Sequence, residues 1–473
     1  MFTKTTLDKR KKKWYHVGMR NEKEISAIYS AIRQAGGNPY MVGGSVRDMV
    51  VGTQPKDVDT EVFGIAYAPL VEVLSHFGSV NAVGVSFGVI KLRTPSGNEY
   101  DFSLPRRDSK TGKGHKGFMV EVDHSMTIAD AAKRRDYTIN AISIDVDGNV
   151  VDPYNGLDDL RTRTLRHTSE QFGEDPLRVL RGMQFAGRMD LTVTDETAAI
   201  CRDLRTEYDT LAQERIWGEW EKWAAKSVVP SQGLEFLNAT SWVYQYPELA
   251  ALIGVPQEPE WHPEGSVWIH TKMVCDAAAA IAIREGLNAT QRATLVFGAL
   301  CHDLGKPATT VVNDSGRIVS PGHDREGVQP TITFMTSIGA PAAMIAEIAE
   351  LTQYHMRHIG FEGGKAARRL ANQMTATTPQ MLGWIMEADY NGRPWTGEFT
   401  MPEDGFDFIA SMTKAMTEAK EAIQPILMGR HLIEMGVKPG PKMGHILRLV
   451  QAAQVEGIVT DFEQAQAYAR TLI

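Results

Sequence analysis

The stretch that decides the fold of this chain is residues 41–64, MVGGSVRDMVVGTQPKDVDTEVFG. The glycine pair after the apolar Met-Val predicts a tight turn between a short strand and a helix over 45–52. The segment KDVDTEV alternates with a period of two, which predicts a strand with Asp57 and Asp59 on one face. This order of strand, glycine turn, helix and acidic strand is typical of a site that holds phosphates and divalent cations.

Asp57 and Asp59 have the chemistry of a phosphoryl-transfer centre. Along a strand their carboxylates would lie about 7 Å apart, and Mg²⁺ prefers such hard oxygen ligands, completed by substrate phosphates. Two metal ions held in this way suit in-line attack of a hydroxyl group on phosphorus. Gly43 and Gly44 let a phosphate approach the backbone, and Arg47 offers a fixed cation. Because Asp pairs are common on protein surfaces, the interpretation depends on these neighbours.

The composition limits the class of protein. With 473 residues the chain is too long for one ordinary core, so two to four domains are expected. Hydrophobic residues make up 43% and no long apolar run occurs, which predicts a globular protein without a membrane span. The three cysteines, Cys201, Cys275 and Cys301, are scattered. Neither a disulfide framework nor a cysteine zinc site is expected, and a reducing, cytoplasmic setting fits best.

The net charge of −8 does not by itself indicate a nucleic-acid partner. Local basic clusters at residues 9–13, 106–116 and 133–135 would have to serve one. The first of these clusters is equally typical of a solvated terminus. The charge therefore favours a modest electrostatic share in any binding of nucleic acid.

The pattern predicts mixed α/β structure for the first third of the chain, with a helix over 24–36 and strands over 39–42, 58–64, 89–93 and 98–104. Asp101 lies on the last of these strands. It could complete a carboxylate triad with Asp57 and Asp59, or be a solvated strand residue. The segment 105–117, PRRDSKTGKGHKG, is rich in Gly, Lys and Arg and is predicted to be a mobile loop.

Two charged clusters follow this region. In Arg134-Arg135-Asp136, one arginine could contact a triphosphate or a ribose while the aspartate holds the other. From about residue 174 the pattern is helical, and Glu174-Asp175-Pro176-Leu177-Arg178 opens a helix, for which a capping role is adequate.

A functional alternative is that Asp175 and Arg178, three residues apart, share a helix face. The carboxylate would accept from the exocyclic amine of C or A, and the guanidinium would donate to the neighbouring ring nitrogen or carbonyl. G and U present the reversed pattern and would be rejected.

Taken in order, these motifs resemble the class II tRNA nucleotidyltransferases, which comprise the CCA-adding enzymes and the bacterial poly(A) polymerases. The matching segments, which cover about residues 38–190, are YMVGGSVRD, KDVDTEV, AAKRRDYTINAI, VDPYNGLDDLRTRTLRH and FGEDPLRVLRGMQF.

The resemblance implies roles for individual residues. Asp57 and Asp59 match the Mg²⁺ ligands of the family, and Asp175 and Arg178 match the amino-acid template that pairs with the incoming C or A. Further nucleotide-contacting positions correspond to Gly43, Gly44, Arg47, Arg135, Asp136 and Arg181. One departure is Gln184, where similar enzymes often carry an arginine, and Arg188 could supply the missing contact.

A third cluster lies in the second half of the chain and combines imidazole and carboxylate groups, which suit a divalent transition metal such as Ni²⁺ or Mn²⁺, or Mg²⁺. His270, His302, Asp303 and Asp389 follow the order of the HD phosphohydrolases, which they resemble. His323 and His355 could bind a second metal. The resemblance implies phosphatase and 2′,3′-cyclic phosphodiesterase activity, in which a metal-bound hydroxide attacks a phosphoester. A purely structural HD domain is the alternative.

The expected fold is therefore α+β, with a polymerase-beta-like nucleotidyltransferase head of small mixed sheet, followed by an all-α neck, body and HD domain. The expected domains are a head over 20–165, a neck and body over 166–260, an HD domain over 261–400 and a helical tail over 401–473. The resemblance implies a monomer or homodimer that rebuilds the CCA end of tRNA from CTP and ATP. Its alternatives are a poly(A) polymerase, a CC-only or A-only enzyme, an HD phosphohydrolase with an RNA-gripping head, and a non-catalytic RNA-binding module.

Overall fold

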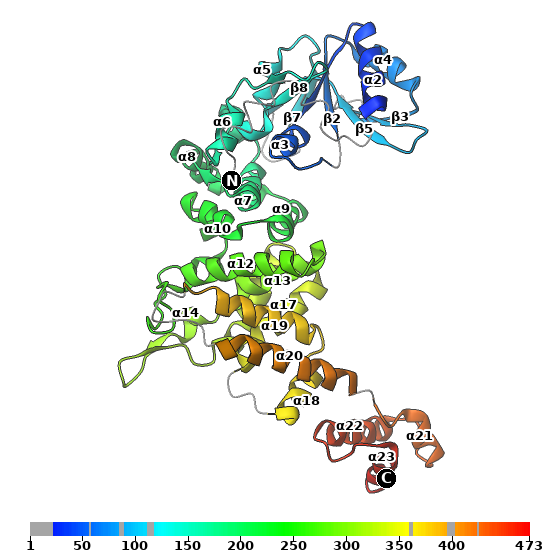
Figure 1. Ribbon diagram of the computed structural model, residues 1–473, viewed down its shortest axis with the longest axis vertical. Coiled ribbons are helices and arrows are strands. Elements are labelled where there is room, and N and C mark those ends of the chain that lie inside the picture. Colours follow the sequence, from blue (N-terminus) through cyan, green and yellow to red (C-terminus); the bar gives the residue numbers. More distant parts are fainter. Residues whose placement is uncertain are drawn as a thin grey trace. The chain divides into compact units, whose positions relative to one another are not determined.

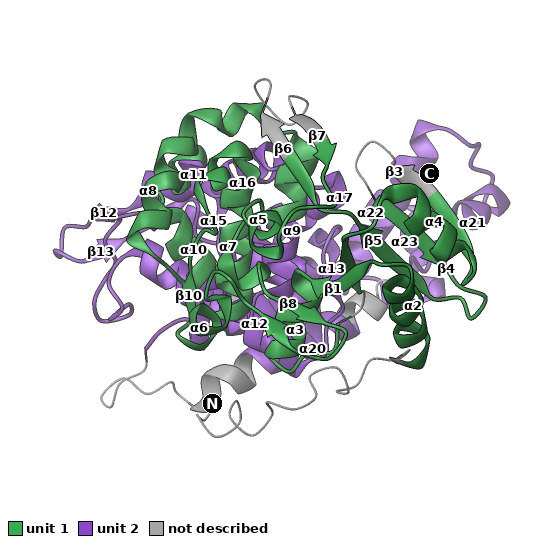
Figure 2. Cartoon of the chain, turned by 90° about the horizontal axis from the view of Figure 1, so that it is seen from above, with its two compact units in different colours: residues 1–219, 232–245 green, residues 220–231, 246–473 purple. Residues whose placement is uncertain are grey.

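The computed structural model describes residues 22–55, 58–84, 89–110, 118–358, 363–394, 403–422 and 425–473. The chain falls into two compact units, shown in different colours in Figure 2. Unit 1 comprises residues 1–219 and 232–245, and unit 2 comprises residues 220–231 and 246–473. Among the described residues, no helix has both the length and the apolar character needed to span a membrane. The predicted domain boundaries near 165, 260 and 400 would subdivide these units, and they stay predictions.

Unit 1 contains a mixed sheet in the strand order β3-β4-β5-β2-β1-β8-β9. Strands β2 and β5 run parallel, whereas the other neighbouring strands are antiparallel. The small mixed sheet of the predicted head is thereby confirmed. The strands are β1 (Asn38–Val42), β2 (Asp59–Phe63), β3 (Ser79–Gly84), β4 (Val89–Arg93), β5 (Glu99–Ser103), β8 (Ser143–Asp145) and β9 (Val150–Val151).

Helices α2 (Glu22–Gln34) and α4 (Tyr67–Ser75) pack together and against this sheet (Figure 1). Helix α2 carries its buried apolar residues at Ile25, Ile28, Tyr29 and Ile32, the spacing of one helix face. These side chains share a core with the sheet residues Val62, Ile90, Leu92 and Phe102. The hydroxyl of Tyr29 bonds Thr60 Oγ1 at 2.6 Å, which ties α2 to β2.

The segment predicted to be a mobile loop is partly a strand. Strand β6 (Arg106–Lys110) pairs antiparallel with β7 (Phe118–Val122), so the prediction was wrong for residues 106–110. The ladder is continued by the Asp123 N–H, which donates to the Pro105 carbonyl at 2.9 Å. Composition alone could not predict this strand, because its stability comes from pairing with FMVEV, which begins only after the polar run has ended. Residues 111–117 lie outside the described residues.

The rest of unit 1 is mainly helical. Its close packing depends on Gly182 in α7, because a Cβ atom there would lie 2.1 Å from the hydroxyl of Tyr137 and 2.5 Å from the ring of Phe236. The elements of this region are α3 (Gly44–Val50), α5 (Ile128–Ala132), η3 (Thr138–Asn140), α6 (Gly156–Arg161), β10 (Thr164–Leu165), η4 (Glu170–Glu174), α7 (Leu177–Met189), β11 (Thr192–Val193), α8 (Asp195–Asp203), η5 (Leu204–Thr210), α9 (Gln213–Lys226), α10 (Pro230–Ala239) and η6 (Trp242–Gln245).

Unit 2 is built around α12, α13, α17 and α19, which pack against one another. Polar caps start several of these helices: Ser266 accepts from the Ile269 N–H at the start of α12, and Thr378 from the Met381 N–H at the start of α19. The elements are α11 (Pro247–Ala250), α12 (Val267–Arg284), α13 (Ala289–Cys301), α14 (Lys306–Thr309), β12 (Val311–Val312), β13 (Ile318–Val319), α15 (His323–Glu326), α16 (Val328–Ser337), α17 (Ala342–Tyr354), η7 (His355–His358), α18 (Gly363–Gln373), α19 (Pro379–Asn391) and α20 (Glu403–Ala422).

The last helices form a core of their own. Leu432 in α21, Ile446 and Val450 in α22, and Ala465 and Ala469 in α23 belong to one buried cluster. The helices are α21 (Gly429–Glu434), α22 (Pro441–Val455) and α23 (Phe462–Arg470). The helical character predicted for the tail is therefore observed.

Two candidate active sites

The carboxylates predicted for catalysis meet on two neighbouring strands of unit 1. Asp59 begins β2, and its partner in the parallel register with β5 is Asp101. Register partners on adjacent strands point to the same face of a sheet, so the two carboxylates can serve one cation together. Asp101 also forms an ion pair with Lys91, whose Nζ lies 3.0 Å from Asp101 Oδ2. Asp57 lies outside the described residues.

The glycine turn after β1 borders the same spot. Gly43 has a φ of 72°, in the left-handed region that favours glycine. A Cβ atom on Gly43 would lie 3.2 Å from Arg135 Nη1 and 3.9 Å from Asp59 Oδ2, and one on Gly44 would lie 3.4 Å from Arg47 Nη2. The turn, a carboxylate and two guanidinium groups thus surround a place that side chains on the glycines would fill.

Arg47 is held in place by hydrogen bonds. Its Nε and Nη2 donate to Asp48 Oδ1 at 2.9 and 2.7 Å, and its Nη1 donates to Asn140 Oδ1 at 2.6 Å. Burial lowers the pKa of Arg47, and Asp48 opposes that shift. The other oxygen of Asp48 accepts from Arg188 Nη2 at 2.9 Å. Arg188, which we expected to replace an arginine at position 184, therefore binds the carboxylate that also orients Arg47.

Asp136 orients a second arginine. Its carboxylate accepts from Arg181 Nε at 2.7 Å, from Asn140 Nδ2 at 2.8 Å and from the Tyr137 N–H at 2.8 Å. Burial alone would raise the pKa of Asp136, but the charge of Arg181 and these hydrogen bonds lower it. Arg181 and Arg47 each lie about 5 Å from the ring centre of Phe185, at 5.2 and 5.1 Å. The carboxylate stays charged and holds Arg181 directly, and it also holds Asn140, the residue that accepts from Arg47.

Glu61 is a residue of this region that our sequence analysis missed. Its side chain is only 3% exposed and accepts from Arg134 Nη2 at 2.6 Å and from Arg135 Nη2 at 3.5 Å. Burial would raise the pKa of Glu61, but the charges of Arg135 and Arg134 lower it. The sequence contains a pattern that could have predicted Glu61, because this residue continues the two-residue alternation of Asp57 and Asp59.

The predicted base-reading pair has a different local geometry from the one we expected. Asp175 is extended (φ −129°, ψ 106°) and precedes α7, so it does not share a helix face with Arg178. Asp175 Oδ1 accepts from the Leu177 N–H at 3.0 Å, which is the capping role, and Oδ2 accepts from Arg215 Nη2 at 2.8 Å. Arg178 donates to the carbonyls of Gln171 and Arg134 at 2.6 and 2.8 Å.

Arg215 comes from α9 and was not predicted, because nothing in the local sequence links it to Asp175. Gln184 is 3% exposed, so its position faces the interior.

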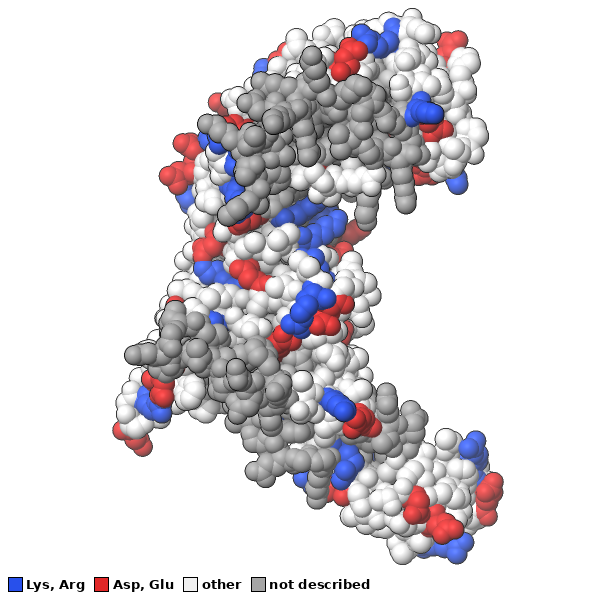
Figure 3. Space-filling view, viewed as in Figure 1, with Lys and Arg blue, Asp and Glu red and all other residues white. Residues whose placement is uncertain are grey.

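Figure 3 shows Lys and Arg side chains gathered over the part of unit 1 that carries α7 and α9. Arg181, Arg188 and Arg215 are among the partly exposed cations of these two helices, with side chains 36%, 27% and 29% exposed. This local cluster exists in spite of the negative net charge.

The Glu61 contacts predict a pH-dependent stability. Glu61→Gln should lower the free energy of unfolding by roughly 1.5–3 kcal/mol at neutral pH, because the amide keeps an acceptor but loses the charge. The pKa of Glu61 is lower in the folded than in the unfolded chain, so its contribution is full above the unfolded value of 4.5 and is lost as pH falls through the folded value. Urea denaturation should therefore show the difference between variant and wild type shrinking below about pH 4.5.

A matched control for this prediction is Glu99→Gln, because Glu99 is 70% exposed and pairs only loosely with Arg93. That variant should change the free energy of unfolding little at any pH. A difference for Glu61→Gln that stays constant from neutral to acid pH would contradict the assigned role of its charge.

In unit 2, the structure brings all six residues predicted for the HD site together. His270 Nε2 lies 3.0 Å from Asp389 Oδ1, and His302 Nε2 lies 3.2 Å from Asp303 Oδ2. On the other side of Asp303, Oδ1 lies 3.4 Å from His323 Nε2 and 4.0 Å from His355 Nε2. The six residues of this cluster come from α12, the end of α13, α15, η7 and α19.

These residues fit divalent cations. Ligand atoms of His270, His302 and Asp303 lie within 4.8 Å of one another, and so do those of Asp303, His323 and His355. Asp303 is shared, so its two oxygens could bridge two metal ions. His302 Nε2 is buried and faces the Asp303 carboxylate, a second candidate ligand, at 3.2 Å, so the two groups fit a shared cation.

The protonation states support this fit. Burial opposes the charge of Asp303 and Asp389, but the neighbouring cations lower the pKa of both far below the usual range: His302 and Lys306 act on Asp303, and Arg393 acts on Asp389. Burial lowers the pKa of His355 to about 3, so its imidazole is neutral and has a lone pair to offer. Anionic carboxylates and neutral imidazoles are the forms that bind metal. Burial opposes the charge of His302, but Asp303 raises its pKa, so metal binding at His302 would release a proton.

A cavity of about 600 Å³ opens beside this cluster. Lys306 and Arg393, which were not predicted, lie on its wall and pair with the cluster carboxylates: Lys306 Nζ lies 2.7 Å from Asp303, and Arg393 Nη2 lies 3.4 Å from Asp389. The wall also includes the aromatic side chains of Trp261 and Tyr390. Cations beside a metal-ligand cluster and aromatic rings at a rim suit an anionic ligand with a flat part.

The chain is similar to several known proteins. The poly(A) polymerase head domain matches residues 39–166. The multifunctional CCA protein of Xanthomonas oryzae pv. oryzae (strain MAFF 311018) is 34% identical over 429 residues, covering 88% of this chain and 97% of that protein. The multifunctional CCA protein of Stenotrophomonas maltophilia (strain K279a) is 39% identical over 310 residues, covering 64% of this chain and 72% of that protein.

Two solved structures resemble the fold. The CCA-adding enzyme of Bacillus stearothermophilus in complex with CTP has a TM-score of 0.63 at 18% identity. The match covers 96% of this chain and 99% of that enzyme. The CCA-adding enzyme of Thermotoga maritima complexed with tRNA has a TM-score of 0.59 at 15% identity. The match covers 99% of this chain and 98% of that enzyme. These likenesses confirm the predicted fold, a nucleotidyltransferase head followed by helical regions.

Proposed function

This chain belongs to the family of multifunctional CCA proteins, and on that premise we propose that it adds and repairs the 3′-terminal CCA of tRNA from CTP and ATP. The observation that carries the proposal is the parallel register of β2 and β5, which sets Asp59 beside Asp101 next to the Gly43 turn. Nucleotidyltransferases of this family require a divalent metal. We assign Mg²⁺ to Asp59 and Asp101, together with Asp57 as the family pattern implies.

The chain's own residues orient the reactants. When bound, the metal ion would neutralise the triphosphate and favour ionisation of the attacking 3′-hydroxyl of tRNA. Gly43 and Gly44 keep the backbone open to the triphosphate, and Arg47, fixed by Asp48 and Asn140, offers it a preorganised cation. Nucleotidyl transfer then joins the 3′-oxygen to the α-phosphorus and releases pyrophosphate.

Base selection is assigned to Asp175 and Arg178. Asp175 has roughly four lone-pair positions and uses two of them on Leu177 and Arg215, so it can still accept from an exocyclic amine. Arg178 is anchored by two carbonyls, which limits its movement. Arg215 holds the Asp175 carboxylate at one oxygen, and we assign it the role of directing the other oxygen toward the base. The hairpin of strands β6 and β7 is proposed to reposition between C and A addition.

The transferase proposal predicts the outcome of an incorporation assay. A tRNA that lacks its CCA end should receive C, C and A in that order from CTP and ATP, followed on a sequencing gel. Asp59→Ala should reduce incorporation by at least about 10³-fold, because the cation loses a ligand at the reacting phosphate. Long A tails, or addition of only C or only A, would instead support the poly(A) polymerase or partial-addition alternatives.

The base-selection proposal predicts a loss of discrimination in Asp175→Ala. A base-reading pair contributes about 1–3 kcal/mol of discrimination. Incorporation of UTP and GTP relative to CTP and ATP should therefore rise by roughly 5- to 150-fold, measured as ratios of kcat/KM. Asp209→Ala, at an exposed aspartate in η5, is the control and should leave the ratios unchanged. Equal ratios in Asp175→Ala and wild type would remove Asp175 from base selection.

We propose a second, hydrolytic activity at the cluster of unit 2. Its support is the cluster of six buried metal-binding groups, in which Asp303 belongs to two sets of ligand atoms and Asp389 contacts His270, beside a cavity with the cations Lys306 and Arg393. The substrates would be phosphomonoesters and 2′,3′-cyclic phosphates at RNA ends. Ni²⁺, Mn²⁺ or Mg²⁺ is the assigned metal, which would supply an activated water when bound.

A separate proposal concerns the setting of the protein. The three cysteines are all buried and free, which supports the expected reducing, cytoplasmic setting.

The hydrolytic proposal predicts that the two activities separate. Asp303→Ala should abolish Mn²⁺- or Ni²⁺-dependent hydrolysis of 2′,3′-cyclic AMP and 2′-AMP, because both groups of ligands share that carboxylate. It should leave CCA addition at the wild-type rate, and Asp59→Ala should show the reverse. A wild-type protein that hydrolyses neither compound with any of the three metals would favour the structural alternative for this domain. Loss of both activities in one folded variant would contradict the two-site proposal.

A further inference from the structure

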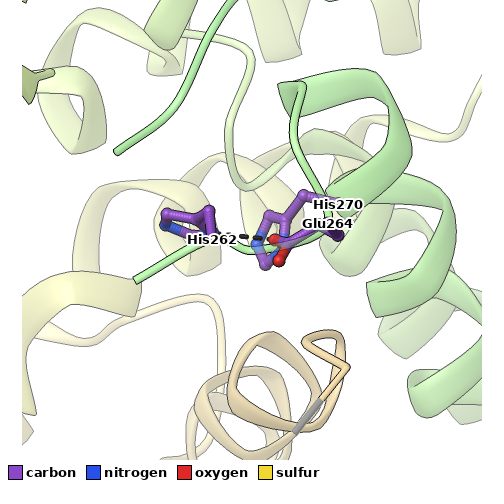
Figure 4. Close-up of side chains that lie close together, drawn as sticks. All are labelled: His262, Glu264 and His270. Atoms are coloured by element: carbon purple, nitrogen blue, oxygen red, sulfur yellow. Dashed lines mark hydrogen bonds and ion pairs between the residues drawn. The ribbon is translucent and has the colours of Figure 1, made fainter. Parts of the chain in front are cut away.

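Glu264 connects the cavity wall to the HD cluster. Figure 4 shows it together with His262 and His270. Its Oε1 lies 2.8 Å from His262 Nδ1 and 2.8 Å from His270 Nδ1, and its side chain is 1% exposed. The rings of His262 and His270 meet edge to face, with centres 4.7 Å apart. A carboxylate with this burial and two imidazole partners is built into the fold rather than left at its surface.

The contacts of Glu264 bear on which nitrogen of His270 binds a metal. Both ring nitrogens face carboxylates, Nδ1 that of Glu264 at 2.8 Å and Nε2 that of Asp389 at 3.0 Å, and an ionised carboxylate only accepts hydrogen bonds, so either nitrogen can carry a proton in the metal-free chain. A metal ion bound at Nε2, which lies 3.0 Å from Asp389 and 3.8 Å from Asp303, would displace the proton there and leave the proton on Nδ1, facing Glu264. His302 needs no such partner from Glu264, because its Nδ1 lies 2.7 Å from the Ala299 carbonyl. His323 and His355 are likewise oriented by carbonyls, at Ser320 and Thr352.

We propose that Glu264 is a positioning residue that fixes the tautomer and ring orientation of His270 for metal binding, with His262 as the group that holds Glu264 in place. His270 is thereby the one histidine of the cluster oriented by a charged group rather than by a carbonyl. A carboxylate behind a ligand imidazole also increases the basicity of that imidazole. The inference rests on the hydrolytic function proposed for this cluster.

A competing interpretation is that His262, Glu264 and His270 themselves bind a metal ion, since their ligand atoms also lie within 4.8 Å of one another. His270 would then have to use Nδ1 for this ion and Nε2 for the HD cluster, which requires loss of both ring protons. A neutral imidazole has one lone pair to offer. The geometry therefore favours the positioning role, and the number of bound ions distinguishes the two.

The test measures Mn²⁺ binding by isothermal titration calorimetry in the full-length Asp59→Ala protein, so that the head site does not contribute. Glu264→Ala should weaken binding about 10- to 100-fold without changing the number of ions bound. Glu264→Gln keeps an acceptor oxygen for the Nδ1–H and should recover most of that loss. His262→Ala should weaken binding by a smaller factor, again at constant stoichiometry.

Glu260→Ala is the matched control, because Glu260 lies in the same loop, is exposed and pairs with Arg317. It should bind Mn²⁺ like the parent. Unchanged affinity in Glu264→Ala, or no recovery in Glu264→Gln, would overturn the positioning role. A loss of one ion in Glu264→Ala or His262→Ala would overturn it in favour of the competing metal site. Binding that is unaffected by Asp303→Ala would show that the HD metal site itself is absent, a failure of the proposed function rather than of this inference.

Discussion

The parallel pairing of β2 with β5 is the contact on which the transferase half of the molecule depends. One face of β2 carries Asp59 and Glu61, and the opposite face carries Thr60 and Val62, which contact α2 and the core. The same short strand therefore positions a carboxylate for the cation, a carboxylate for two arginines and the anchor of a helix. A register shift by one residue would exchange all of these faces at once.

The order of motifs in the sequence predicted the fold class and the six residues that meet in the cluster of unit 2. Local periodicity was sufficient where a function depends on neighbours in the chain, as for the Gly43 turn and the acidic strand. Local periodicity would also have predicted Glu61, which continues the alternation of Asp57 and Asp59 by one more step. The strand at residues 106–110 was missed because its stability comes from a partner segment rather than from its own residues.

Pairings between distant segments could not be predicted. Arg215 binds Asp175 across 40 positions of sequence, and Arg188 binds Asp48 across 140. Likewise, nothing around His302 indicates that Arg393 will stand beside Asp389. The expected geometry of Asp175 was wrong because the residue before a proline is driven toward extended backbone, which placed it ahead of the helix rather than within it. Each of these contacts is a property of the folded chain.

The carboxylate of Asp48 has a consequence for how the head responds to its substrates. One oxygen orients Arg47 at the turn, and the other binds Arg188 on α7, the helix that begins beside Asp175 and carries Arg178 and Arg181. Groups that share one charged partner do not contribute independently to a free energy. The triphosphate binding and the base selection that we propose for these residues are thus linked thermodynamically, and each is expected to alter the strength of the other by the same factor.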